Sequence, residues 1–168
     1  MSFEISLYDA TQIYAGQKQF DCGNAVINSF VQGSLKSQVK KSLSVAYVLT
    51  DSADARRFAG FYTLAQHMID VAALSPLQLG SLPRKIPCSR LIMLGVDTRY
   101  QSQQLGARMM KHALLLTKTI AHQIGSYGLY LDADENAVAF YQKLGFALLE
   151  GHPSPAPSPM FLPINAIG

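Results

Sequence analysis

The stretch that most constrains the fold runs from Leu91 to Ile124. It begins with an apolar run, residues 91–96, continues through a short polar loop, residues 97–104, and ends in a long amphipathic segment. Apolar residues recur in that segment at spacings of three and four, which is typical of one face of a helix. The members of this face are Leu105, Met109, Ala113, Leu116, Ile120 and Ile124. The stretch therefore predicts a strand, a tight loop and a helix.

The junction between the loop and the helix predicts an anion site. A helix that starts directly from a loop presents unpaired N–H groups and a partial positive charge, both of which favour phosphate. Arg99 and Arg108 flank this point, although their alternative role is simple solvation. No acidic residue occurs between Asp97 and Asp132. These features indicate an enzyme that uses a phosphate-bearing cofactor.

The overall composition fits one compact domain spanning residues 1–168. The 168 residues are 49% hydrophobic, enough for a sizeable core. No apolar run is long enough for a membrane span, and the N-terminus lacks the pattern of a signal peptide, so we expect a cytoplasmic protein without a membrane partner. Cys22 and Cys88 stand in no metal-ligand spacing, which predicts free thiols and no metal.

The basic residues are unevenly distributed. The net charge is +3, and residues 22–50 and 71–96 contain no acid. The basic residues of these two segments are Lys36, Lys40, Lys41, Arg84, Lys85 and Arg90. They form either an ordinary solvated surface or the surface for a polyanionic partner, which would be the cofactor alone or the cofactor with a nucleic acid.

The rest of the chain predicts short strands and helices around the central stretch. We expect strands at residues 3–7, 45–50, 58–63, 127–132, 146–149 and 160–164, the last at a sheet edge because of Pro163. We expect helices after Asn24, within 34–42, and after the residues 134–136, with Gly145 as the end of the last helix. Residues 71–89 are expected to be a loop with at most a short helix, and the proline-rich stretch from Pro153 to Pro159 is expected to be a loop.

Two motifs and this order of elements resemble the GNAT acetyltransferases. Residues 94–107 resemble the strand and pyrophosphate loop of that family, and residues 136–146 resemble its late helix, with Asn, Ala, Phe-Tyr and Gly-Phe in place. The resemblance implies an α/β (α+β) GNAT fold, with a mixed, mostly antiparallel sheet, a central β-α-β unit and flanking helices. It also implies an acetyl-CoA-dependent N-acetyltransferase.

The resemblance assigns roles to individual residues. Backbone groups of Leu94, Gly95 and Val96 would bind the pantetheine arm, against the alternative of a plain core strand. Asn136 would bind the same arm or cap a helix, and Tyr141 would protonate the departing thiolate or merely pack beside Phe140. The residues assigned to the pyrophosphate are Arg99, Gln101, Ser102, Gln103, Gln104, Leu105, Gly106 and Ala107.

The loop departs from the family pattern at two positions. The family sequence is usually Gln-Gly-Gln-Gly-Leu-Gly, whereas this chain has Ser102 and Gln104 in place of two glycines. Glycine lets a backbone turn its N–H groups toward phosphate with no side chain in the way. Ser102 adds a hydroxyl donor, and Gln104 has to hold its side chain outward for acetyl-CoA to bind.

Three further stretches, residues 20–24, 82–87 and 160–163, resemble the GNAT toxins of type II toxin–antitoxin systems. The resemblance implies that the acceptor is the α-amine of an aminoacyl-tRNA, and an antitoxin protein and a second copy of the chain are candidate partners. No general base is evident, which suits an α-amine, since it titrates near ~7.7–8.0 while a lysine amine titrates near ~10.4. The alternatives are an acetyltransferase for a small amine or a protein N-terminus, and a GNAT-fold module that binds acetyl-CoA without turnover.

Overall fold

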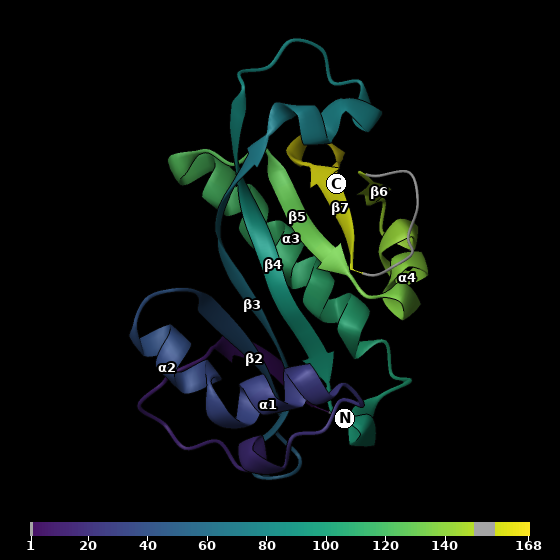
Figure 1. Ribbon diagram of the computed structural model, residues 1–168. Helices are drawn as coiled ribbons and strands as arrows, with labels where there is room; N and C mark the ends of the chain where they lie inside the picture. The colour runs from purple at the N-terminus through teal and green to yellow at the C-terminus, as the bar shows by residue number, and fades with distance from the viewer. Residues whose placement is uncertain (1, 150–156) are drawn as a thin grey trace. The chain divides into compact units, whose positions relative to one another are not determined.

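The computed structural model describes residues 2–149 and 157–168 (Figure 1). The strands are β1 (Phe3–Leu7), β2 (Val45–Asp51), β3 (Arg57–Asp70), β4 (Lys85–Val96), β5 (Gly128–Ala133), β6 (Ala147–Leu148) and β7 (Ser158–Pro163). The helices are α1 (Ala25–Gly33), α2 (Leu35–Lys40), α3 (Leu105–Ile124) and α4 (Val138–Lys143). Short 3-10 turns are η1 (Gln17–Gln19), η2 (Val71–Leu77), η3 (Thr98–Tyr100), η4 (Glu135–Ala137) and η5 (Ile164–Ala166).

The strands form one sheet in the order β1-β2-β3-β4-β5-β7-β6. The β4–β5 pair is parallel, and β1–β2, β2–β3, β5–β7 and β6–β7 are antiparallel. The helix α3 connects the two parallel strands, as a β-α-β unit requires. The sequence-based prediction of a mixed, mostly antiparallel sheet around a central β-α-β unit is confirmed.

The chain forms two compact units. Unit 1 comprises Met1–Ala65 and Ile92–Ala113, and unit 2 comprises Gln66–Leu91 and Leu114–Gly168. The elements β3, β4 and α3 contribute residues to both.

Unit 1 is held together by an aromatic core. Phe20 meets Phe58 and Phe61 edge to face, with ring centroids 5.4 and 5.7 Å apart, a geometry that aromatic quadrupoles favour. All three rings are fully buried. The helix α1 begins at Asn24, whose side chain accepts hydrogen bonds from two backbone N–H groups of its first turn, so this predicted cap is confirmed.

Unit 2 has its own apolar core and its own part of the sheet. In it β5 lies beside β7 (Figure 1), and Ser89 to Leu91 of β4 pair with Leu129 to Leu131 of β5. The buried members of the core are Ile69, Leu74, Ile86, Cys88, Leu149 and Phe161. Cys88 and the half-buried Cys22 of unit 1 are both free thiols, as predicted.

Three predictions about strand limits are wrong. The strand β3 continues to Asp70, whereas the predicted strand ended at residue 63. The strand β4 begins at Lys85 rather than at Leu91, because buried Ile86 and Cys88 alternate with exposed residues although prolines lie nearby. The strand β7 lies between β5 and β6 rather than at an edge. Pro163 is tolerated there because β6 pairs with β7 only at Met160 and Phe161, so Pro163 lies beyond that pairing. Pro153 and Pro155, for which a loop was expected, lie outside the described residues.

Candidate active site

The end of β4 brings backbones very close together in unit 1. A Cβ built on Gly95 would lie 3.3 Å from the Cys22 sulfur, and a Cβ on Gly60 of β3 would lie 2.9 Å from the Gly95 carbonyl oxygen. Only glycine permits this approach without displacing a neighbour. The predicted cofactor residues Leu94, Gly95 and Val96 therefore belong to a strand end whose backbone position is closely fixed.

The turn after β4 is anchored by Asp97. Its buried carboxylate accepts hydrogen bonds from the N–H groups of Arg99, at 3.0 Å, and Asp21, at 3.2 Å. Its own N–H donates to the Ala59 carbonyl at 2.8 Å, and the Thr98 N–H donates to the Asp21 carbonyl at 2.9 Å. The turn that leads into the predicted phosphate loop is thus fixed by both β3 and the segment before α1.

Residues 20–24 brace this turn, a role that sequence analysis missed. The Asn28 side chain accepts from the Cys22 N–H at 2.8 Å and donates to the Asp21 carboxylate at 2.9 Å. The amide of Gln101 donates to the carbonyls of Val96, at 2.9 Å, and Cys22, at 3.2 Å. The only signal in the sequence was the similarity of residues 20–24 to the GNAT toxins.

The loop itself has the backbone conformation of a glycine-rich loop without the glycines. Ser102 has a φ of 67° and Gln104 a φ of 60°, both in the left-handed region that L-residues avoid. These are the two positions at which the family usually has glycine. When successive residues alternate between right-handed and left-handed backbone conformations, their N–H groups point to the same side, and this geometry binds anions. The loop therefore fits a pyrophosphate, although its side chains do not match the family pattern.

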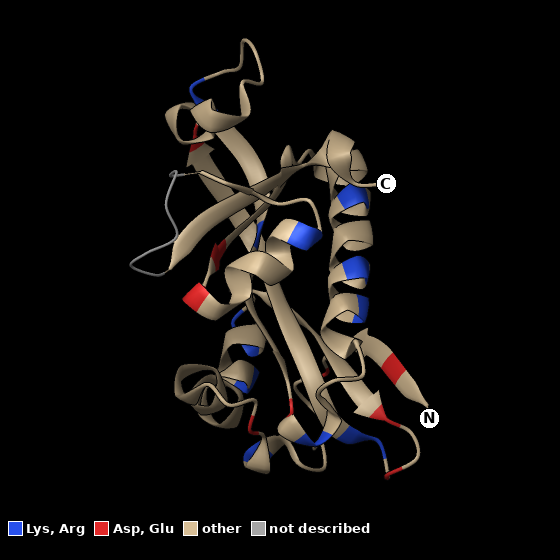
Figure 2. Ribbon diagram, turned by 90° about the vertical axis from the view of Figure 1, so that its right-hand side faces the viewer, with Lys and Arg blue, Asp and Glu red and all other residues tan. Residues whose placement is uncertain are grey.

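The helix α3 follows directly from this loop. Its first turn contains no acidic residue, and every charged residue along it is Lys or Arg, as Figure 2 shows on the ribbon. Arg108 donates to the Phe3 carbonyl at 3.0 Å, so its guanidinium holds β1. Arg99 lies exposed in η3. With no acidic residue in its first turn, the positive end of the α3 dipole is a favourable position for an anion.

In unit 2, Tyr141 is a buried aromatic acid on α4. It is 8% exposed and lies edge to face with Phe140 and Phe146, at 5.1 and 5.7 Å between ring centroids. Burial, and to a smaller extent the nearby Asp134, raises the pKa of Tyr141 to about 12. The phenol is therefore protonated at neutral pH, as a proton donor must be.

Asn136 lies exposed in η4. The cap positions of η4 and α4 are held by Asp134 and Ala137, so the alternative role of Asn136 as a helix cap is wrong. The predicted cap by Asp134 is made without a side-chain hydrogen bond. Gly145 follows α4 with a φ of 102°, as expected for a glycine that ends a helix.

The histidines have separate environments. His112 is hydrogen-bonded to the Tyr62 hydroxyl at 2.6 Å in unit 1, and burial lowers its pKa. His67 stacks on Tyr130 in unit 2, and His152 lies outside the described residues. Among residues 2–149 and 157–168, no group of three metal-ligating side chains is arranged to hold an ion.

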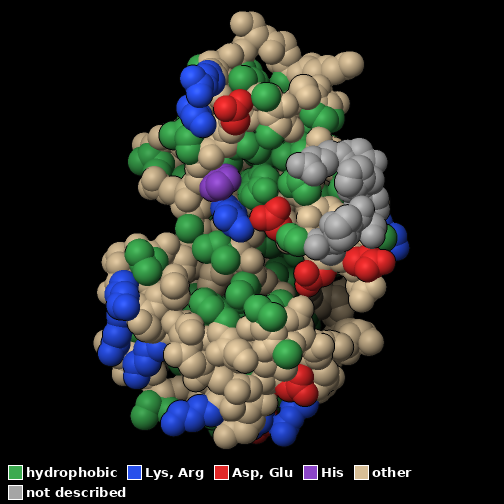
Figure 3. Space-filling model, viewed as in Figure 1, with side chains coloured by type: hydrophobic (Ala, Val, Ile, Leu, Met, Phe, Trp, Pro, Cys, Tyr) green, Lys and Arg blue, Asp and Glu red, His purple; other side chains and the backbone are tan. Residues whose placement is uncertain are grey.

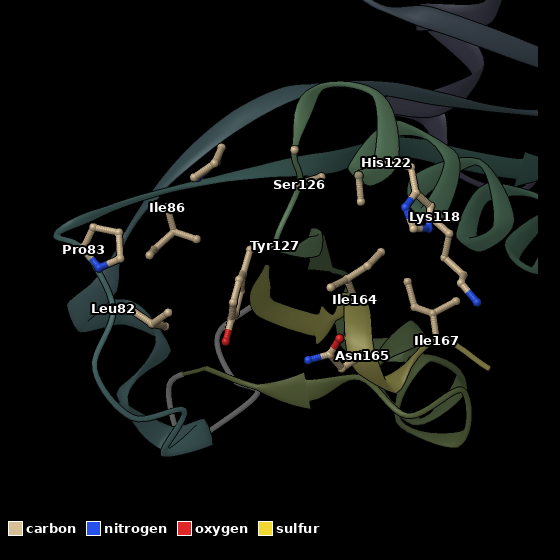
Figure 4. A pocket seen from close by; sticks show the side chains of 13 residues that line it. Leu82, Pro83, Ile86, Lys118, His122, Ser126, Tyr127, Ile164, Asn165 and Ile167 are labelled. Atoms are coloured by element: carbon tan, nitrogen blue, oxygen red, sulfur yellow. The ribbon is translucent and has the colours of Figure 1, made fainter.

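A cavity of about 620 Å³ in unit 2 contains none of the predicted site residues. Figure 4 shows Ile86, Tyr127, Ile164 and Ile167 around it, with Lys118 and His122 at one side. Its walls are largely apolar, and no acidic residue lines it.

The predicted basic surface is only partly available for a partner. Lys36, Lys40 and Lys41 are exposed, and Figure 3 shows basic side chains gathered over α2. In unit 2, Lys85 forms an ion pair with Asp70 at 3.6 Å, and Arg90 pairs with Asp132 at 3.1 Å. Over the part of the chain that is described, no helix has the length and apolar character needed to cross a bilayer.

A family profile described as acetyltransferase (GNAT) domain matches residues 45–148, more than half of the chain. Together with the fold, this match defines an acetyl-CoA-dependent N-acetyltransferase. The chain belongs to the GNAT acetyltransferase family.

Several solved structures of toxins are similar over nearly the whole chain. The crystal structure of a bacterial toxin is 36% identical, with a TM-score of 0.94 over 99% of this chain and 93% of that one. AtaT complexed with acetyl-methionyl-tRNAfMet is 28% identical, with a TM-score of 0.86 over 99% and 97% of the two chains. A Tyr-to-Phe mutant of AtaT bound to acetyl-CoA and the C-terminus of the antitoxin AtaR is 26% identical, with a TM-score of 0.83 over 98% and 95%.

Proposed function

We propose that this chain transfers the acetyl group of acetyl-CoA to the α-amine of an aminoacyl-tRNA, and so acts as a toxin that blocks translation. The observation that carries the acceptor assignment is the full-length similarity to AtaT, which has been solved with acetyl-methionyl-tRNAfMet. The lack of a carboxylate on the strand segment 91–96 supports it, because an α-amine needs less help to lose its proton than a lysine amine.

The predicted residues have distinct parts in the reaction. The N–H groups of residues 101–107 hold the pyrophosphate at the start of α3, with Arg99 nearby, and the backbone of Leu94–Val96 holds the pantetheine arm, assisted by Asn136. The amine nitrogen attacks the thioester carbonyl, and the C–N bond forms as the C–S bond breaks. Tyr141 donates its phenolic proton to the departing thiolate, the proton of the amine passes to water, and Tyr141 regains a proton from water before the next turnover.

A protein antitoxin is the partner that we propose for control of this activity. The antitoxin-bound AtaT mutant supports this assignment. Since acetyl-CoA and aminoacyl-tRNA are cytoplasmic, we place the chain there, as a single catalytic domain of residues 1–168. A second copy of the chain stays a candidate partner.

The experiment is a direct assay of product. Purified protein is incubated with acetyl-CoA and either methionyl-tRNA, a small amine such as spermidine, or a peptide with a free N-terminus, while released CoA is measured with a thiol reagent. Acetylated methionyl-tRNA with a CoA release equal to the product supports the proposal. Turnover with the small amine or the peptide, but not with methionyl-tRNA, supports the small-amine or N-terminal alternative. Binding of acetyl-CoA without CoA release supports the non-catalytic module.

A further inference from the structure

Four side chains that the proposed reaction does not use form a cluster on unit 2. They are His67 from β3, Arg90 from β4, and Tyr130 and Asp132 from β5. Tyr130 and Arg90 are opposite each other in the parallel pairing of β4 with β5. Figure 3 shows a histidine, a basic and an acidic side chain side by side at the surface. The cluster therefore presents aromatic and charged groups to solvent from three strands.

The geometry of the cluster is well fixed. The rings of His67 and Tyr130 stack with centroids 4.9 Å apart and an interplanar angle of 26°. The Arg90 guanidinium lies 5.8 Å from the centre of the Tyr130 ring, within the range of a cation–π contact. Asp132 accepts from both Arg90, at 3.1 Å, and the Tyr130 hydroxyl, at 2.9 Å. Each ring is thus oriented before any ligand arrives.

The charge of the cluster is balanced. Burial, followed by the positive charge of Arg90, lowers the pKa of His67, while Asp132 acts in the opposite direction. The imidazole is therefore neutral at neutral pH, and Arg90 and Asp132 neutralise each other. A neutral aromatic surface flanked by a paired cation and anion suits a planar, weakly polar ligand better than it suits a phosphate.

The cluster opens onto a cavity of about 710 Å³, within the range of roughly 300–1,000 Å³ that is usual for small-ligand sites. His67, Tyr130 and Asp132 line it, together with Met68, Ala72, Pro159 and Asp70, whose carboxylate pairs with Lys85 at 3.6 Å. The lining therefore combines aromatic, aliphatic and carboxylate groups. Asp132 also has lone pairs beyond its two bonds, which are able to accept from a hydroxyl.

We propose that the His67–Tyr130 stack, flanked by Arg90 and Asp132, binds the 3′-terminal adenosine of the aminoacyl-tRNA acceptor. This inference rests on the proposed function. The aminoacyl ester is carried by the ribose of that nucleoside, so the adenosine has to lie within one aminoacyl group of the reacting amine. Bases stack on aromatic side chains in single-stranded nucleic-acid sites, and adenine offers a large π-face. Asp132 accepts from a ribose hydroxyl.

The test compares two acceptors that share the same α-amine. One is methionine joined by an amide to 3′-amino-3′-deoxyadenosine, and the other is methionine amide, which lacks the nucleoside. The wild-type kcat/KM should be at least about 10-fold higher for the nucleoside acceptor. His67→Ala should lower kcat/KM for that acceptor by roughly 5- to 150-fold, the scale of losing one stacked base, mostly through KM. Its kinetics with methionine amide should change less than about 2-fold.

Two further variants separate stacking from simple packing. His67→Phe keeps a planar ring and should restore the preference for the nucleoside acceptor. His122→Ala is the matched control, because His122 is another histidine of unit 2 that lines the separate cavity in Figure 4. It should leave the preference unchanged.

The outcomes separate this inference from the function on which it rests. If His67→Ala keeps the full preference for the nucleoside acceptor, or loses both acceptors equally, the adenosine site is wrong while the proposed function stands. If the wild-type protein acetylates methionine amide but neither aminoacyl-tRNA nor the nucleoside acceptor, the proposed function fails and this inference fails with it.

Discussion

Replacing Ser102 and Gln104 by glycine tests the interpretation of the phosphate loop. Both residues have left-handed backbones, which cost an L-residue roughly 1–2 kcal/mol each. Glycine removes that cost, but it loses more conformational entropy on folding than other residues, which destabilises the folded state by about 0.5–1 kcal/mol. The double variant should therefore gain about 1.5 kcal/mol in the free energy of unfolding. For a chain of this size the expected rise in Tm is about 3–6 °C.

The assay is thermal unfolding with and without acetyl-CoA. The Kd for acetyl-CoA should stay the same or fall, because two side chains leave a loop whose backbone keeps its conformation. Gln103→Gly is the matched control, since Gln103 lies between these residues and is not among those with positive φ. It should lower Tm. A double variant that is less stable than wild type, or that binds acetyl-CoA more weakly, would refute the reasoning.

Three further predictions concern the cofactor, the acceptor and pH. Acetyl-CoA should raise the Tm of the wild-type protein but not of Gly106→Asp, because a carboxylate at the start of α3 repels phosphate. If the Tm of the variant rises as much as that of the wild type, the loop is not part of the cofactor site. Replacing exposed Lys40 and Lys41 by Ala should reduce the salt dependence of tRNA binding and leave acetyl-CoA binding unchanged; salt-independent binding in the wild type would contradict a phosphate contact there. Burial lowers the pKa of His112 in the folded state. The unfolded chain therefore binds more protons than the folded chain near pH 6, and the free energy of unfolding falls as the pH drops below about 6.5, the ordinary pKa of histidine. His112→Gln should make Tm less dependent on pH between 7.5 and 5, and an equally steep profile would exclude His112 as its source.

The central stretch was predictable because its periodicity is local. The helical spacing from Leu105 to Ile124 and the apolar run before it need no tertiary information. The missed start of β4 has a local cause as well, since Pro83 and Pro87 conceal the alternation of Ile86 and Cys88.

The network that fixes the phosphate loop was not predictable in the same way. The bond from the Asp21 N–H to Asp97 joins residues 76 apart in the chain, and no sequence spacing indicates it. The His67–Tyr130 stack likewise depends on where two strands lie in the sheet. No motif surrounds His67 in the sequence, and only the folded chain places it against an aromatic ring.

The most direct test of the account is the rate of acetyl transfer by Tyr141→Phe with methionyl-tRNA as acceptor. The substitution keeps the buried ring, so Tm and acetyl-CoA binding should be close to wild type. We predict that wild type forms N-acetylmethionyl-tRNA and that Tyr141→Phe lowers kcat by about 10²-fold or more, the scale of a lost general acid. A wild-type rate in the variant, with intact folding and cofactor binding, would contradict proton donation by Tyr141 to the departing thiolate.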